Sequence, residues 1–206
     1  YNQHYKVSEE KMNRFWIFLA VVVVGLGVLF VATKPKDDGP SAFTGDAAKI
    51  QSDDHAKNGK ENNVTLIEYA DFQCPACGAY FPILKEVSTL YKDKVNFIFR
   101  HFPIISIHPN AFAASRAAEA AGNQGKFWEM HNVLFNNRRN LGTTSLKLHS
   151  KEAGVKNKKF LDDLVNGMYG WQIQDDIKEG HNRGVKELPT FFINDVLFVG
   201  KPTFAN

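Results

Sequence analysis

The sequence predicts an α/β domain in which a block of helices is inserted between a strand–helix–strand unit and a final β-hairpin. Two short runs, Val64–Ala70 and Val95–His101, are rich in β-branched and apolar residues, which is typical of buried strands. The stretch between them and the long stretch 110–184 show helical spacing instead. Residues 190–199 then read as two short strands joined by a tight turn.

The first expected helix begins near Cys74 and continues to Tyr91. Pro75 suits the first helical position, because the N–H that proline lacks would have no partner there. Its apolar residues recur at helical spacing: Tyr80, Phe81, Leu84, Val87, Leu90 and Tyr91. A strand, a helix and a second strand over this length predict a βαβ unit with a right-handed crossover.

The helical insertion is expected at about residues 108–184. Glycines divide it into five helical stretches, at 111–121, 126–135, 144–153, 157–165 and 171–181. After Pro189 come the expected strands 190–193 and 196–199, and the dipeptide Asn194-Asp195 between them is a hairpin signal.

The N-terminal quarter predicts a membrane anchor followed by a tether. No charged residue occurs in 15–33, which is long enough to span a bilayer core of about 30 Å. A cleaved signal peptide is the alternative, but the run is longer than a signal core and no small-x-small site follows closely. We therefore expect a short segment at 1–14, an anchor at 15–33, a polar tether at 34–48, and the domain at 49–206. Slightly more basic residues precede the anchor than follow it, so we expect residues 1–14 on the cytoplasmic side.

Composition limits the remaining classes of function. A chain of 206 residues has room for one ordinary core, and its formal charge of +3 is spread along the sequence. The longest basic clusters, at 138–139 and 156–159, are short and broken, so we expect no nucleic-acid partner.

The chain has only two cysteines, Cys74 and Cys77. Cys74 is expected where a strand gives way to a helix, beside unpaired backbone N–H groups and the positive end of the helix dipole, which favour the thiolate. We predict that Cys74 is the more acidic, more exposed and more nucleophilic sulfur, and that Cys77, one turn further along, is the resolving or buried partner. Exchange would then pass through a mixed disulfide on Cys74, and no other cofactor is needed.

The cysteine pair has two other interpretations, a zinc site and a purely structural disulfide. A zinc site would need two more ligands from a carboxylate or from histidines that form no tight pair, so we expect no metal. These histidines are His55, His101, His108, His131, His149 and His181. A purely structural disulfide is disfavoured, because so short a loop restrains little of the unfolded chain.

Glu68 interrupts an otherwise apolar strand six residues before Cys74. A carboxyl group buried under the active-site helix would have a raised pKa and could exchange a proton with the inner thiol. The alternative is a solvated glutamate at the sheet edge. We expect the proton-transfer role.

Four fragments, in this order, resemble the DsbA-like branch of the thioredoxin superfamily: residues 53–55, 64–78, 124–135 and 188–194. The resemblance runs from about residue 50 to the end of the sequence. It implies a thioredoxin-like fold with an inserted helical domain, Cys74 as nucleophile and Cys77 as its partner. It also implies that Pro189 is cis, against the alternative of an ordinary trans proline, and that Leu188 and Pro189 lie beside the dithiol. Substrate would then contact Pro75, Ala76, Leu188 and Pro189.

Three features depart from the family pattern. Leu188 replaces a more usual Val or Thr, and Ala76 stands where the most oxidising members carry His, which predicts a milder oxidant. The chain also ends soon after the last strand, where relatives continue into a final helix; we expect either a truncated helix or another cover for that sheet face.

The sequence therefore predicts a single-pass, membrane-anchored oxidase outside the cytoplasm that donates the disulfide of Cys74 and Cys77 to secreted or surface proteins. We expect a bacterial membrane redox partner to regenerate it. The alternatives are a reductase or isomerase of the same fold and a tethered metal-binding module.

Overall fold

The computed structural model describes residues 53–58, 64–156 and 158–200. The predicted segments 1–14, 15–33 and 34–48 lie outside these ranges. Among the described residues, no helix has both the length and the apolar character needed to cross a bilayer.

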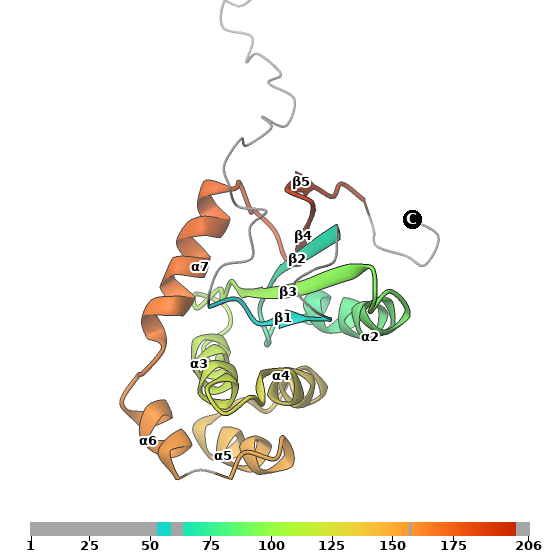
Figure 1. The fold of residues 1–206 in the computed structure, drawn as a ribbon. Helices are drawn as coiled ribbons and strands as arrows, with labels where there is room; N and C mark the ends of the chain where they lie inside the picture. The colour runs from blue at the N-terminus through green and yellow to red at the C-terminus, as the bar shows by residue number, and fades with distance from the viewer. Residues whose placement is uncertain (1–52, 59–63, 157, 201–206) are drawn as a thin grey trace, which may run out of the picture. The chain divides into compact units, whose positions relative to one another are not determined.

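A five-stranded mixed sheet forms the centre of the domain, with strand order β1-β3-β2-β4-β5 (Figure 1). Its strands are β1 (Ala56–Lys57), β2 (Val64–Ala70), β3 (Val95–His101), β4 (Thr190–Ile193) and β5 (Val196–Leu197). β2 and β3 are parallel, as a βαβ unit requires, and the other neighbouring strands are antiparallel.

The terminal hairpin turns at Asn194 and Asp195, which both have positive φ angles of 45° and 70°. Two-residue hairpin turns with this backbone favour Asn and Asp, so the predicted turn is confirmed. Asn194 also fixes the turn to β2, because its side-chain oxygen accepts a hydrogen bond from the N–H of Thr65 at 2.8 Å. Strand β5 ends at Leu197, two residues earlier than expected.

The described residues form six helices: α2 (Pro75–Leu90), α3 (Ala111–Gly122), α4 (Phe127–Asn136), α5 (Thr143–Glu152), α6 (Lys159–Val165) and α7 (Gly170–Asn182). Figure 1 shows α5 and α6 farthest from the strands, beyond α3 and α4, with α7 returning toward the sheet. Each predicted helix is present, with ends within two residues of the expected ones.

Alternation along β2 assigns its side chains to opposite faces of the sheet. Ala70 packs in a core with Phe99 and the inserted helices, whereas Ile67 and Tyr69 pack in a second core with Ile98. The helical insertion therefore shares one continuous core with the sheet rather than standing apart from it.

The sheet face that carries Ile67, Tyr69 and Ile98 is covered by residues near the end of the helical insertion, a feature that the sequence did not predict. Helix α7 contacts β3, and its Ile177 packs against the core formed by Ile67, Tyr69 and Ile98. Val185, just after α7, is buried in the same core. In the described residues, α7 and the segment after it thus cover this face.

Candidate active site

Cys74 occupies the N-cap position of α2. Strand β2 ends at Ala70, a short turn follows, and Pro75 begins the helix. Cys74 has extended backbone angles, with φ −64° and ψ 127°, and its N–H donates to the carbonyl of Asp71 at 3.1 Å. Its sulfur therefore faces the free amide groups of the first helical turn, as the sequence predicted.

The two sulfurs differ in exposure and in acidity. Cys74 is 7% exposed, Cys77 is fully buried, and both are free thiols. The hydrogen bond from the Cys77 thiol lowers the pKa of Cys74 to about 6, with help from the amides of Cys77 and Ala76, although burial acts in the opposite direction. The pKa of Cys77 is raised, by its hydrogen bond to Cys74 and by burial. The geometry thus supplies one thiolate and one protonated partner at neutral pH.

Glu68 lies on the face of β2 that α2 covers, and it is 1% exposed. Burial raises its pKa to about 8, so its carboxyl group is protonated at neutral pH. When it ionises, its negative charge raises the pKa of the Cys77 thiol further, and within the described residues its Oε1 atom has no hydrogen-bond partner. The predicted burial of Glu68 is confirmed, and the solvated alternative is excluded.

A small cavity of about 10 Å³ adjoins Glu68 and is lined also by Lys57 and His131. This volume has room for about one water molecule. Burial lowers the pKa of His131 to about 3, and burial also lowers the pKa of Lys57. Lys57 donates to the hydroxyl of Ser88 at 3.0 Å and is only partly buried, so it connects the cavity with the surface.

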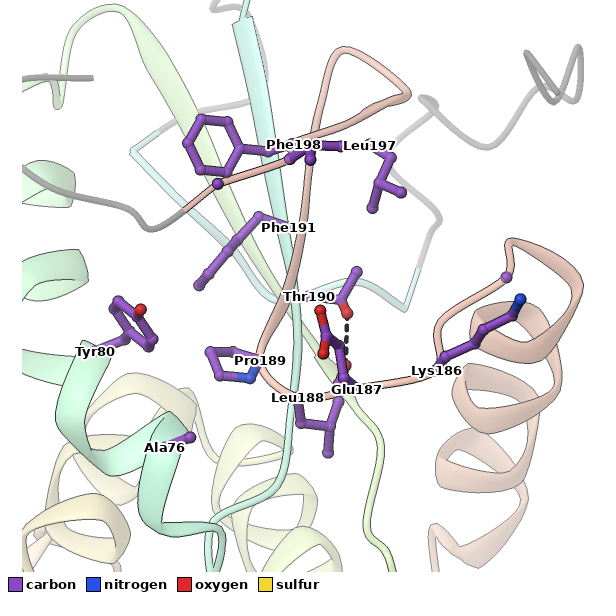
Figure 2. A pocket seen from close by; sticks show the side chains of 13 residues that line it. Ala76, Tyr80, Lys186, Glu187, Leu188, Pro189, Thr190, Phe191, Leu197 and Phe198 are labelled. Carbon is purple, nitrogen blue, oxygen red and sulfur yellow. Dashed lines mark hydrogen bonds between the residues drawn. The ribbon is translucent and has the colours of Figure 1, made fainter. Parts of the chain in front are cut away.

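A groove of about 650 Å³ runs past the start of α2 (Figure 2). Ala76 and Tyr80 line one side, and Leu188 and Pro189 line the other, with the Leu188–Pro189 peptide bond in the cis form. Figure 2 shows the Pro189 ring between α2 and the final strands. Phe191, Leu197 and Phe198 extend the apolar lining toward the hairpin.

The structure brings the predicted site residues together in one region. Ala76, Leu188 and Pro189 share the groove, and Leu188 also packs against the core that contains Cys74 and Cys77. Pro75 is exposed at the first position of α2.

Sequence reasoning did not assign Lys57, Tyr80 or His131 to the site. Lys57 reaches it through β1, a strand of only two residues that no sequence pattern announces. His131 lies within residues 124–135, the third fragment that resembles the family, and this position was the feature of the sequence that could have assigned it to the site. Within the described ranges, no cluster of three or more His, Cys, Asp or Glu side chains has the arrangement of a metal site.

Residues 53–206 match the family model described as Thioredoxin. The chain belongs to the thioredoxin family. Among curated relatives, a protein of Salinispora arenicola named Na(+)/H(+) antiporter NhaA 1 is 35% identical over 141 residues, which are 68% of this chain. The match spans only 22% of that relative's length.

Solved structures share the fold at low sequence identity. The catalytic domain of Proteus mirabilis ScsC is 20% identical with a TM-score of 0.65, over 78% of this chain and 88% of that one. BdbD from Bacillus subtilis, in its oxidised form, is 19% identical with a TM-score of 0.64, over 72% of this chain and 85% of that one. These likenesses bear out the thioredoxin-like fold that the sequence predicted.

Proposed function

We propose that this protein is a thiol:disulfide oxidoreductase that donates the disulfide of Cys74 and Cys77 to client proteins. The observation that carries the proposal is the contrast between the two sulfurs. Cys74 has a pKa of about 6 at the head of α2, and Cys77 is buried beside it with a raised pKa. A low pKa makes Cys74 both a good leaving group and a stable thiolate in the reduced pair.

The reaction begins with the oxidised pair and a client thiolate. The client sulfur attacks Sγ of Cys74, the bond between Cys74 and Cys77 breaks, and the electron pair leaves on Cys77. A second client thiolate then attacks the client sulfur of this mixed disulfide and releases Cys74 as a thiolate. The client loses two electrons and gains a disulfide, and the cysteine pair takes up those electrons.

Glu68 supplies the proton in the first step of this proposal. Cys77 leaves as a thiolate in a buried site, where its raised pKa makes protonation strongly favourable. The neighbouring Glu68 carboxyl has a pKa of about 8 and carries a proton at pH 7. After donating it, Glu68 regains a proton through the cavity that it shares with Lys57.

The groove beside the dithiol is the proposed client site. Its largely apolar lining suits an extended, unfolded segment. Ala76, between the two cysteines in the sequence, lines one wall, and Leu188 and Pro189 line the other. An unfolded client presents apolar side chains and reduced cysteines together. These are the features that an oxidase for newly exported proteins has to recognise.

The cellular setting belongs to the same proposal. We place the domain outside the cytoplasm, held to the cell membrane by residues 15–33, because a donor disulfide persists in an oxidising compartment. A membrane redox partner would reoxidise the pair. Support for the anchor comes from the sequence, since residues 15–33 lie outside the described ranges.

A reductase or isomerase is the second candidate, and one observation favours it. The pKa of about 6 for Cys74 lies between about 7 for thioredoxin and about 3.5 for a strong oxidant. Equilibration with glutathione buffers separates the two functions. A reduction potential of about −270 mV would indicate a reductase, and a potential of about −120 mV would indicate a strong oxidase.

The nucleophile is tested with two matched cysteine variants, each given one form of a client protein. Cys74→Ser should abolish disulfide transfer to the reduced client. Cys77→Ser, mixed with the oxidised client, should be trapped as a mixed disulfide, because the Cys74 thiolate opens the client disulfide and Cys77 is absent to resolve it; the product is visible on a non-reducing gel. Transfer that survives in Cys74→Ser would overturn the assignment.

The role of Glu68 has its own experiment. Glu68→Gln should slow the cleavage of the Cys74–Cys77 disulfide on the order of a hundredfold, the usual size of general-acid catalysis. Asp163→Asn is the matched control, because Asp163 is also a buried carboxyl but lies in α6, outside the lining of this cavity. Equal rates in Glu68→Gln and the wild type would remove Glu68 from the mechanism.

A further inference from the structure

Asp71 places a fully buried carboxylate directly behind the nucleophile. Its side chain has no exposed surface, and its own carbonyl accepts the N–H of Cys74 at 3.1 Å. A negative charge in this position opposes a second negative charge on the Cys74 sulfur, and it raises the pKa of that thiol. The site therefore has to offset the charge of Asp71 to keep Cys74 reactive.

Three hydrogen bonds offset that charge. The carboxylate accepts the N–H of Gln73 at 2.7 Å, the N–H of Ile104 at 2.9 Å, and Nδ1 of His108 at 2.7 Å. Two of these donors are neutral backbone amides. Among the described groups that hydrogen-bond to this carboxylate, His108 is the one whose side chain can also carry a positive charge.

We infer that His108 is a positioning residue for the redox reaction, because its imidazole hydrogen-bonds to the Asp71 carboxylate and thereby weakens the repulsion between that carboxylate and the thiolate of Cys74. The inference rests on the proposed function, in which that thiolate is the reacting group. In this chain Ala76 supplies no imidazole between the two cysteines. His108 would supply one from the segment after β3, acting through Asp71 instead of on the sulfur itself.

The segment that carries His108 is held by bonds that do not need the imidazole. The N–H of His108 donates to the carbonyl of Ile104 at 2.9 Å, and the N–H of Ala111 donates to the carbonyl of His108 at 3.1 Å. The N–H of Asn110 donates to the side chain of Gln73 at 2.9 Å. Removal of the His108 side chain should therefore leave the segment in place and act through charge.

The test is a pH titration of the Cys74 thiolate in the reduced full chain, followed by ultraviolet absorbance. His108→Ala should raise the pKa of Cys74 by about half a unit to one unit. From a starting pKa of about 6, this rise lowers the equilibrium preference for the reduced pair at pH 7 by about three- to fivefold. His149→Ala is the matched control, because His149 is also buried but bonds to the carbonyl of Asn140.

A double-mutant cycle with Asp71→Asn separates charge from loop position. Asp71→Asn alone should lower the pKa of Cys74. When His108→Ala is added to Asp71→Asn, the further change in the pKa of Cys74 should be less than about a third of the change that His108→Ala causes in the wild type. If His108→Ala does not fold, His108→Asn takes its place in the cycle.

Two results would overturn the inference. The first is that the pKa of Cys74 is the same in His108→Ala as in the wild type. The second is that His108→Ala raises the pKa of Cys74 equally in the wild type and in Asp71→Asn, as a displaced loop would. Both leave the proposed function intact, because disulfide transfer by the wild type and its loss in Cys74→Ser do not depend on His108.

Discussion

Replacing Glu68 with Gln should remove a marked pH dependence from the stability of this domain. The carboxyl group is 1% exposed, and burial raises its pKa from its ordinary value of 4.5 to about 8. The folded protein therefore holds a proton that the unfolded chain releases above about pH 4.5. The stabilising effect of that proton is complete below about pH 4.5 and is lost as the pH rises to about 8.

The size of the effect follows from the two pKa values. Each pH unit in this window costs about 1.4 kcal/mol, so at pH 7 Glu68 lowers the free energy of unfolding by about 3 kcal/mol relative to its value in acid. Glutamine has a similar shape but does not ionise. The free energy of unfolding of Glu68→Gln should thus lack this loss.

The assay is urea unfolding of both reduced proteins at several values between about pH 5 and pH 8. The free energy of unfolding of the variant, minus that of the wild type, should grow by about 1.4 kcal/mol per pH unit. Every other titrating group is shared by the two proteins, so the difference isolates Glu68. Two parallel curves would show that Glu68 titrates normally, and the proton-donor argument would then lose its basis.

Three further substitutions test the packing that holds the site. Phe72→Ala should lower the free energy of unfolding by about 3–5 kcal/mol in urea, because this fully buried ring stacks within the core behind Cys74. Gly180→Ala should cost about 1–3 kcal/mol in the same assay, since an added Cβ would lie 2.7 Å from the ring of Phe102. Asp54→Ala should cost about 3 kcal/mol and lower the Tm, because it removes a two-point ion pair from the fully buried Arg100.

The strands and helices of this fold were largely predictable because their signals are local. The run Val64–Ala70 has the composition of a buried strand, and the structure gives β2 those bounds. The Asn194-Asp195 turn was predictable for the same reason, since both residues tolerate positive φ. The position of Cys74 at the head of α2 followed from Pro75 and the apolar spacing after it.

Features that depend on distant contacts were not predictable. Strand β1 has two residues and exists through its pairing with β3, so Lys57 could not be placed beside Glu68 from the sequence. The hydrogen bond between His108 and Asp71 joins residues 37 positions apart, and each residue lies in a loop after a different strand. The sequence also left one sheet face without an assigned cover, because the packing of α7 on it is a tertiary contact.

The central claim is tested most directly by the pH titration of the wild-type thiols, followed by thiolate absorbance or by the rate of alkylation. We expect the Cys74 thiol to ionise with a midpoint of about 6 and the Cys77 thiol to stay protonated well above neutral pH. If both thiols ionised near about 8.5, as free cysteine does, the head of α2 would not activate Cys74 and the proposed chemistry would be contradicted.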